Sequence, residues 1–141
     1  MIINATIVPG ESLGGIAIGS NVEDIISELS NSYSLDAGPD SIIINGGLIT
    51  AYHNDAGTVI SVSCNSSFKG SYLNKLWPGM TVADVRRTTR KQIAHIGFVK
   101  IIGIRGIGLS LPNDRDDFER LTDHFDEDYV FEELWIYKSH I

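Results

Sequence analysis

The stretch "IGSNVEDI" (residues 18–25) decides the fold, because it returns sixty positions later, without a gap, as "PGMTVADV" (78–85). Each copy has a residue of a type that commonly caps helices, then an aspartate three positions later, and then apolar residues at helical spacing. This pattern is close to a capping box and predicts a helix start in both copies. The aligned pairs are Gly19 with Gly79, Asn21 with Thr81, Val22 with Val82, Asp24 with Asp84 and Ile25 with Val85.

The same offset aligns the segments downstream of the two helix starts. "IIINGGLITAY" (42–52) lies on "IGIRGIGLSLP" (102–112), and both contain glycines suited to tight turns between antiparallel strands. An Asn-Asp turn follows in each copy, and then a predicted strand, at 58–64 in the first half and 130–138 in the second. The sequence therefore predicts that each half contains one helix followed by three strands.

We predict an α+β fold in which two helix-strand-strand-strand repeats build one antiparallel sheet of about six to seven strands, with helices packed on one face. The helices are expected at about 21–30 and 81–92, and the repeats at about 13–64 and 73–138. The chain of 141 residues is expected to form a single domain, 1–141, which is large enough to bury a core.

Alternation in the strand 58–64 predicts which of its side chains face the core. The predicted core side contains Ile60, Val62 and Cys64, and the predicted opposite side contains Val59, Ser61 and Ser63.

The charge of the chain is concentrated in one stretch, "DRDDFERLTDHFDEDYVFEE" (114–133). This stretch holds ten acidic and two basic residues, whereas the rest of the chain holds eight acids and nine bases. Most of it is an insertion, 114–129, at the place where the first copy has only residues 56–57. Because loops held by a rigid scaffold commonly carry function, this acidic insertion is the main functional candidate.

Folding explains only part of the acidic insertion. The spacing of Phe118, Leu121 and Phe125 predicts a short amphipathic helix over 115–124. Carboxylates at its start favour the helix dipole, whereas those near its end oppose the dipole and repel one another. We interpret the insertion as a surface for a cationic partner, with an ordinary solvated face as the alternative. The predicted partner-binding residues are Asp114, Asp116, Asp117, Glu119, Asp123, Phe125, Asp126, Glu127, Asp128 and Tyr129.

Composition narrows the class of partner and the compartment. A pI near 4.9 disfavours nucleic acid as the main ligand, because phosphate binding depends on Lys and Arg. The basic cluster "RRTTRK" (86–91) fits self-association or an internal salt bridge as well as it fits RNA. No apolar run approaches the length that crosses a bilayer, so no membrane partner is expected. The N-terminus lacks the pattern of a secretory signal, and Cys64 is a lone cysteine, so we expect a cytoplasmic protein.

The motifs of common enzymes and metal sites do not fit this sequence. "GIRGIG" (103–108) lacks the spacing of G-x-G-x-x-G, and "DRDDFERLTDHF" (114–125) lacks the turn glycine and the third ligand of a calcium loop. His53 and Asp55 are the best acid–base candidates, but a solvated turn pair explains them better. We therefore expect no enzyme, no catalytic residues, no metal and no cofactor, with a small hydrolase as the least favoured alternative.

Two family resemblances follow from these motifs. "GGIAIGSNVEDIISEL" and "LWPGMTVADVRRTT" resemble the tandem units of beta-lactamase inhibitor proteins and of the related small lipoprotein of outer-membrane assembly. This chain departs from both because it lacks a signal peptide, a lipobox cysteine and paired disulfides. "PGESLGGIAIG" and "LWPGMTVADV", with the acidic composition and the size, also resemble small cytosolic immunity proteins of bacterial polymorphic-toxin and contact-dependent growth inhibition systems.

The second resemblance implies an immunity protein whose partner is a cognate basic toxin domain, expected to be a nuclease and more specifically an RNase. A nuclease must be basic to hold phosphates, and clustered carboxylates would steer it quickly onto an inhibitor that covers its active site. The first resemblance implies the alternative, a protein-binding inhibitor or adaptor with a non-nuclease target. Aromatic residues near the acids are candidate anchors, although Trp135 and Tyr137 share one strand face and also fit a core. The candidates are Phe125, Tyr129, Trp135 and Tyr137.

Overall fold

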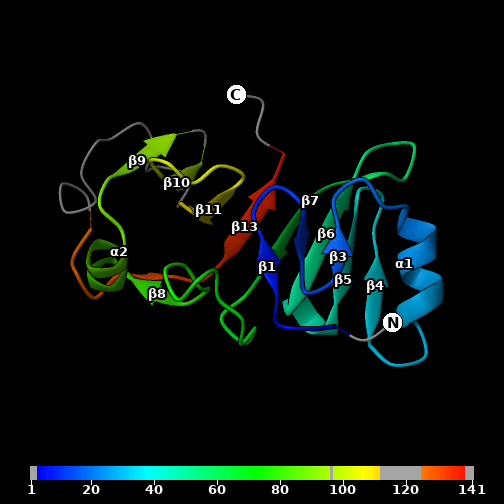
Figure 1. Cartoon of the computed structure of the whole chain (residues 1–141). Helices are drawn as coiled ribbons and strands as arrows, with labels where there is room; N and C mark the ends of the chain where they lie inside the picture. The colour runs from blue at the N-terminus through cyan, green and yellow to red at the C-terminus, as the bar shows by residue number, and fades with distance from the viewer. Residues whose placement is uncertain (1–2, 96, 112–124, 139–141) are drawn as a thin grey trace.

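The computed structural model describes residues 3–95, 97–111 and 125–138. Eight antiparallel strands form its main sheet, and two helices, α1 (Val22–Leu29) and α2 (Val82–Thr88), lie at opposite ends of the molecule (Figure 1). The predicted α+β class with an antiparallel sheet is therefore confirmed.

The eight strands follow the order β4-β5-β6-β7-β13-β11-β10-β9 across the sheet. Helix α1 precedes the first four of these strands in the chain, and α2 precedes the other four, so that the last strand of each half lies at the centre. The bounds are β4 Leu35–Ala37, β5 Ser41–Ile44, β6 Ile49–His53, β7 Val59–Cys64, β9 Gln92–His95, β10 Phe98–Ile101, β11 Ile107–Ser110 and β13 Leu134–Tyr137.

The main sheet has more strands than the predicted six to seven, because each half contains four strands and not three. The short edge strands β4 and β9 are the additional ones, and neither has the apolar alternation by which a strand is recognised in sequence. Helix α2 ends at Thr88, so its predicted extension to residue 92 is wrong. The hydroxyls of Thr88 and Thr89 donate to the backbone carbonyls of Asp84 and Val85, and β-branched residues favour the extended chain that continues into β9.

Smaller elements surround the main sheet. The N-terminal strands β1 (Ile7–Val8), β2 (Ser12–Leu13) and β3 (Ile16–Ala17) form a three-stranded sheet, and β8 (Met80–Thr81) pairs with β12 (Val130–Phe131). A single 3-10 turn, η1 (Asn45–Gly47), connects β5 to β6.

Both helices begin in the way that their sequences predict. At α2 the Thr81 side chain accepts a hydrogen bond from the Asp84 backbone N–H, while the Asp84 carboxylate accepts one from the Thr81 N–H, each at 3.1 Å. This capping box, led by the hydrogen bond from the Thr81 backbone, lowers the pKa of Asp84 below its usual value. At α1 the Asn21 side chain accepts from the Glu23 N–H at 2.8 Å.

Corresponding backbone hydrogen bonds tie each helix start to the segment that leads into the last strand of its half. The Gly19 N–H donates to the Val59 carbonyl, and the Gly79 N–H donates to the Phe131 carbonyl, both at 2.8 Å. The N–H groups at the first residue of each helix form a second pair of such bonds, from Val22 to Gly57 at 2.8 Å and from Val82 to Tyr129 at 3.0 Å. The donors in the two halves are the residues that the sequence offset aligns.

One face of the sheet forms the hydrophobic core together with the helices. The central strands contribute fully buried Val62, Leu134 and Ile136. Because of the strand register, buried residues of the neighbouring strands continue this row from β5 to β10. Apolar residues of both helices belong to the same buried cluster: Val22, Ile25, Leu29, Val82 and Val85.

A β-bulge changes the predicted facing of one residue. Tyr52 pairs with Ser61, but its neighbour His53 pairs with Val59, so that Ile60 is an additional residue in β7. The insertion shifts the alternation by one position. Val59 is therefore buried and Ile60 is 50 % exposed, and the prediction that Ile60 faces the core and Val59 lies opposite is wrong.

The glycine Gly106 holds the N-terminal sheet against the end of β13. Its carbonyl accepts hydrogen bonds from the N–H groups of Gly10, at 3.0 Å, and Tyr137, at 3.1 Å. A Cβ atom at Gly106 would lie 2.6 Å from the Gly10 backbone nitrogen and 3.0 Å from the Tyr137 carbonyl oxygen. The backbone of Gly106 also has φ +79°, which side chains disfavour.

We predict that Gly106→Ala lowers the free energy of unfolding by about 3 kcal/mol or more, because a left-handed backbone and a clash with backbone atoms add. Urea unfolding followed by circular dichroism measures this loss. The matched control is Gly103→Ala, which has φ +92° but no atom within 4 Å of the added Cβ. The control is expected to lose about 1–2 kcal/mol. Equal losses in the two variants would contradict the proposed role of Gly106.

Candidate functional site

The face of the main sheet opposite the core, here called the open face, has aromatic residues on alternate strands. Tyr52 lies on β6, Trp135 and Tyr137 lie on β13, and Phe98 lies on β10. All four are partly exposed. The strands between them, β7 and β11, present small residues on this face: Ser61, Ser63, Gly108 and Ser110.

The small residues allow the four rings to meet above the intervening strands. Tyr52 stacks on Trp135 with ring centroids 4.7 Å apart and planes 19° apart, and Phe98 meets Trp135 edge-on at 5.7 Å. Phe98 also stacks on Tyr137 at 5.2 Å. These separations and angles are favourable for aromatic pairs, so the rings form one connected row across the sheet.

The residues beneath the row leave no room for larger side chains. Ser63 is 3 % exposed although its strand faces outward at this position. A Cβ atom at Gly108 would lie 3.0 Å from the Phe98 Cβ and 3.3 Å from the Tyr137 hydroxyl. The Tyr137 hydroxyl instead donates to the Ile107 carbonyl at 3.1 Å, which fixes the ring over the backbone of β11.

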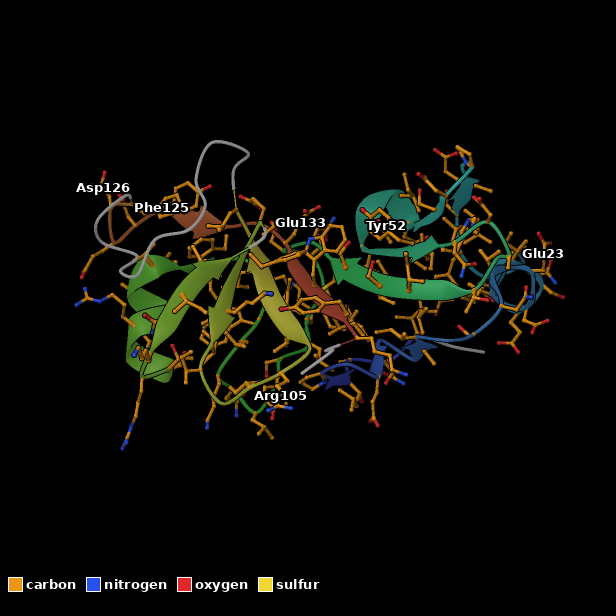
Figure 2. All side chains as sticks on the ribbon, turned by 90° about the horizontal axis from the view of Figure 1, so that it is seen from above. Glu23, Tyr52, Arg105, Phe125, Asp126 and Glu133 are labelled. Carbon is orange, nitrogen blue, oxygen red and sulfur yellow. The ribbon has the colours of Figure 1, made fainter. Side chains whose placement is uncertain are left out.

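Charged groups of opposite sign contact two rings of the aromatic row. Glu133 lies directly before β13, and its carboxylate accepts a hydrogen bond from the Trp135 indole N–H at 3.3 Å. The Lys100 ammonium lies over the Tyr137 ring at 5.4 Å, a cation–π contact. Figure 2 shows Glu133 and Tyr52 near the middle of the molecule, far from Glu23 at the α1 end.

The two tyrosines of the row have raised pKa values because the face is partly dehydrated. Burial raises the pKa of Tyr137 to about 12. Burial is also the main cause that raises the pKa of Tyr52; a hydrogen bond with Ser63 opposes this, while the charges of Glu133 and Asp40 add to it. Charge interactions at this surface are therefore stronger than they would be in open water.

The structure describes half of the ten predicted partner-binding residues. Asp114, Asp116, Asp117, Glu119 and Asp123 lie outside the described residues, as does the predicted helix over 115–124. Asp126, Glu127 and Asp128 are exposed, and Figure 2 shows Asp126 at the α2 end of the molecule.

The two aromatic residues of that set pack inward. Phe125 is 9 % exposed and lies 4.5 Å from Tyr129, and both rings contact Phe131, between centroids at 5.9 Å and 5.3 Å. The segment is fastened to α2 by the Ala83 N–H, which donates to the Glu127 carbonyl at 3.0 Å, and by an ion pair between Arg86 and Glu127. Phe125 and Tyr129 thus anchor the end of the insertion against the domain, and Arg86 of the basic cluster forms an internal salt bridge.

Sequence reasoning identified Trp135 and Tyr137 as candidate anchors but missed Tyr52 and Phe98. The structure brings all four together, although they come from three strands. The available signal was the alternation of small residues in "SVS" (61–63) and "GLS" (108–110), which predicts strands that carry no bulk on one face. That signal does not indicate which aromatic residues lie above them, because this depends on strand order.

The structure also places the alternative chemical candidates, His53, Asp55 and Cys64. The His53 ring nitrogen bonds to the Asn54 carbonyl at 2.9 Å, and Asp55 is exposed in the following turn. Cys64 is buried, and burial raises the pKa of its thiol to about 12. Within residues 3–95, 97–111 and 125–138, no three His, Cys, Asp or Glu side chains are placed to hold a metal ion. The helices of that same part of the chain are too short and too polar to span a membrane.

Comparisons with models of known families, with curated proteins and with solved structures found no match for this chain.

We predict that Tyr137 makes the folded protein less stable as the pH rises from about 10 toward about 12. The unfolded chain releases the phenol proton near pH 10, whereas the folded protein retains it to about 12, so deprotonation favours unfolding across this window. Urea midpoints measured at several alkaline pH values check the fall. In Tyr137→Phe the fall should be smaller, and an unchanged pH dependence would show that another group causes it.

Proposed function

We propose that this protein is an immunity protein that binds a cognate basic nuclease and covers its active site, using the open face and the acidic insertion. The observation that carries this proposal is the connected row of four partly exposed aromatic rings on a rigid sheet. Tyr and Trp dominate the binding energy of many protein interfaces, because they offer large contact area with few rotatable bonds. None of the four rings belongs to the hydrophobic core formed by the described residues.

Charge supports a basic partner. The chain has a net charge of −7, and Asp126, Asp128 and Glu132 are exposed in the segment that leads into β13. A nuclease domain with a positively charged cleft would be steered toward this side of the molecule. An RNase is the target class we favour, and the proposal implies a protein that acts in the cytoplasm, where RNA is the toxin's substrate.

We also infer that the two halves are copies of one helix-plus-strands unit, with the acidic insertion added to the second copy. The corresponding hydrogen bonds of Gly19 and Gly79, and of Val22 and Val82, support this inference. So does the mirrored strand order of the sheet. In such a scaffold the aromatic row crosses the junction of the two copies, since Tyr52 belongs to the first and the other three rings belong to the second.

A second candidate function is an inhibitor of a target other than a nuclease. The aromatic row supports this candidate as well, because aromatic rings can bind a partner that is not basic. The two candidates differ in how binding depends on salt, since only charge-steered association should slow strongly as ionic strength rises.

The test begins with capture of partners from a lysate of the native organism by the immobilised wild-type chain. The captured protein is identified by mass spectrometry and assayed for nuclease activity with and without the wild-type chain. We expect a basic nuclease that the chain inhibits. Captured proteins without nuclease activity would contradict the immunity function, and association that is insensitive to salt would favour the second candidate.

We predict that Trp135→Ala weakens partner binding by about 2 kcal/mol or more, a loss of roughly thirtyfold, because it removes the centre of the aromatic row. Asp126→Lys with Asp128→Lys should chiefly slow association. Calorimetry and stopped-flow mixing measure these two effects. The matched control is Glu23→Lys with Glu28→Lys on α1, which changes the net charge equally at the other end of the molecule and should bind nearly as the wild type does. Equal binding by Trp135→Ala would move the interface off the open face.

A further inference from the structure

The carboxylate of Glu133 occupies an unusual position on the open face. Its own backbone is held in the sheet, because its carbonyl accepts a hydrogen bond from the Ser110 N–H at 3.2 Å. Its side chain is held by the Trp135 indole N–H, which donates to Oε1 at 3.3 Å. The charge therefore has a fixed place at the edge of the stacked pair that Trp135 forms with Tyr52.

No cation within the described part of the chain neutralises this carboxylate. The ion pairs formed there join Arg86 to Glu127 and Arg87 to Asp84. Lys100 lies over the Tyr137 ring. Within the described part of the chain, Oε2 of Glu133 has no hydrogen-bond partner. A carboxylate can accept several hydrogen bonds in addition to the one that Trp135 donates.

The surroundings of Glu133 strengthen its attraction for a cation. Tyr52 stacks on Trp135, which binds the Glu133 carboxylate, and burial raises the pKa of Tyr52 while the charge of Glu133 raises it further. Asp40 acts on Tyr52 in the same direction, which places a second negative charge at this end of the row. A charge pair formed here would be screened less than one on an open surface.

We propose that the partner inserts an arginine side chain at this position, with its guanidinium paired to Glu133 and its planar group against the Tyr52–Trp135 stack. This inference rests on the proposed function, since it names the group by which a protein partner engages the open face. Arginine fits better than lysine because its planar fork donates to a carboxylate at two points and stacks on aromatic rings. The contact would add a directional anchor to an otherwise apolar surface.

The test uses N-acetyl-arginine amide as the probe, titrated into the full ¹⁵N-labelled chain. The reporter is the indole N–H signal of Trp135, identified by its absence from Trp135→Phe. N-acetyl-citrulline amide, which has nearly the same shape without the charge, and N-acetyl-lysine amide are titrated in parallel. We expect the arginine probe to shift the Trp135 signal with a dissociation constant on the order of millimolar, the lysine probe to bind more weakly and the citrulline probe to leave the signal unchanged.

The decisive variant is Glu133→Gln, which retains an oxygen that can accept from Trp135 and removes the charge. It should weaken the arginine probe by about tenfold or more, since it removes a charge-assisted hydrogen bond. The matched control is Glu132→Gln, which neutralises an exposed neighbour and should bind the probe as the wild type does. An equal response to citrulline, an unchanged response in Glu133→Gln or no response to arginine would each overturn the inference.

The outcome separates this inference from the proposed function. Once a nuclease partner is captured, Glu133→Gln is compared with Trp135→Ala for binding to it. If only Trp135→Ala weakens the complex, the arginine contact is wrong while the immunity function stands. If the arginine probe binds at Glu133 but the captured partner has no nuclease activity, the cation site stands and the immunity function is wrong.

Discussion

The pairing of β7 with β13 is the constraint on which the rest of the structure depends. These strands are far apart in the chain, and their register sets Cys64 opposite Leu134 and Val62 opposite Ile136. This register joins two four-stranded meanders into one sheet and makes the buried row continuous across it. Because a shift by one residue would turn every side chain of a strand to the other face, the same register also places Trp135 and Tyr137 outward.

The two faces of the sheet meet different packing requirements. The core face is filled by aliphatic residues and by the apolar sides of α1 and α2. On the open face, serine and glycine on β7 and β11 leave space that rings from neighbouring strands cover, which is why Ser63 is buried without belonging to the core. The result is a firm surface whose contact groups are held by one another, and a surface of this kind loses little freedom when a partner binds.

The end of the acidic insertion is connected to the aromatic row by β12 and the two residues that follow it. This end contains Phe125, Tyr129 and Glu127, which forms the ion pair with Arg86, and it packs beside α2. From there the chain continues through Glu132 and Glu133 to Trp135. Under the proposed function, the exposed carboxylates would attract a partner at long range and the aromatic rings would contact it at short range.

The sequence by itself determined the helix starts, the antiparallel α+β class and the concentration of charge, because caps, alternation and composition are local properties. Thr81 and Asp84 form the predicted capping pair, and Asn21 caps α1 as predicted, although it accepts from the Glu23 N–H and no hydrogen bond pairs it with the Asp24 carboxylate. Only the tertiary structure decided that Ile60 faces outward, since a bulge depends on the pairing of β7 with β6. It also decided that Tyr52 and Phe98 join Trp135, because three strands from distant parts of the chain must first become neighbours in a fixed register. No local pattern encodes that arrangement, and so the candidate site appeared only after the fold was known.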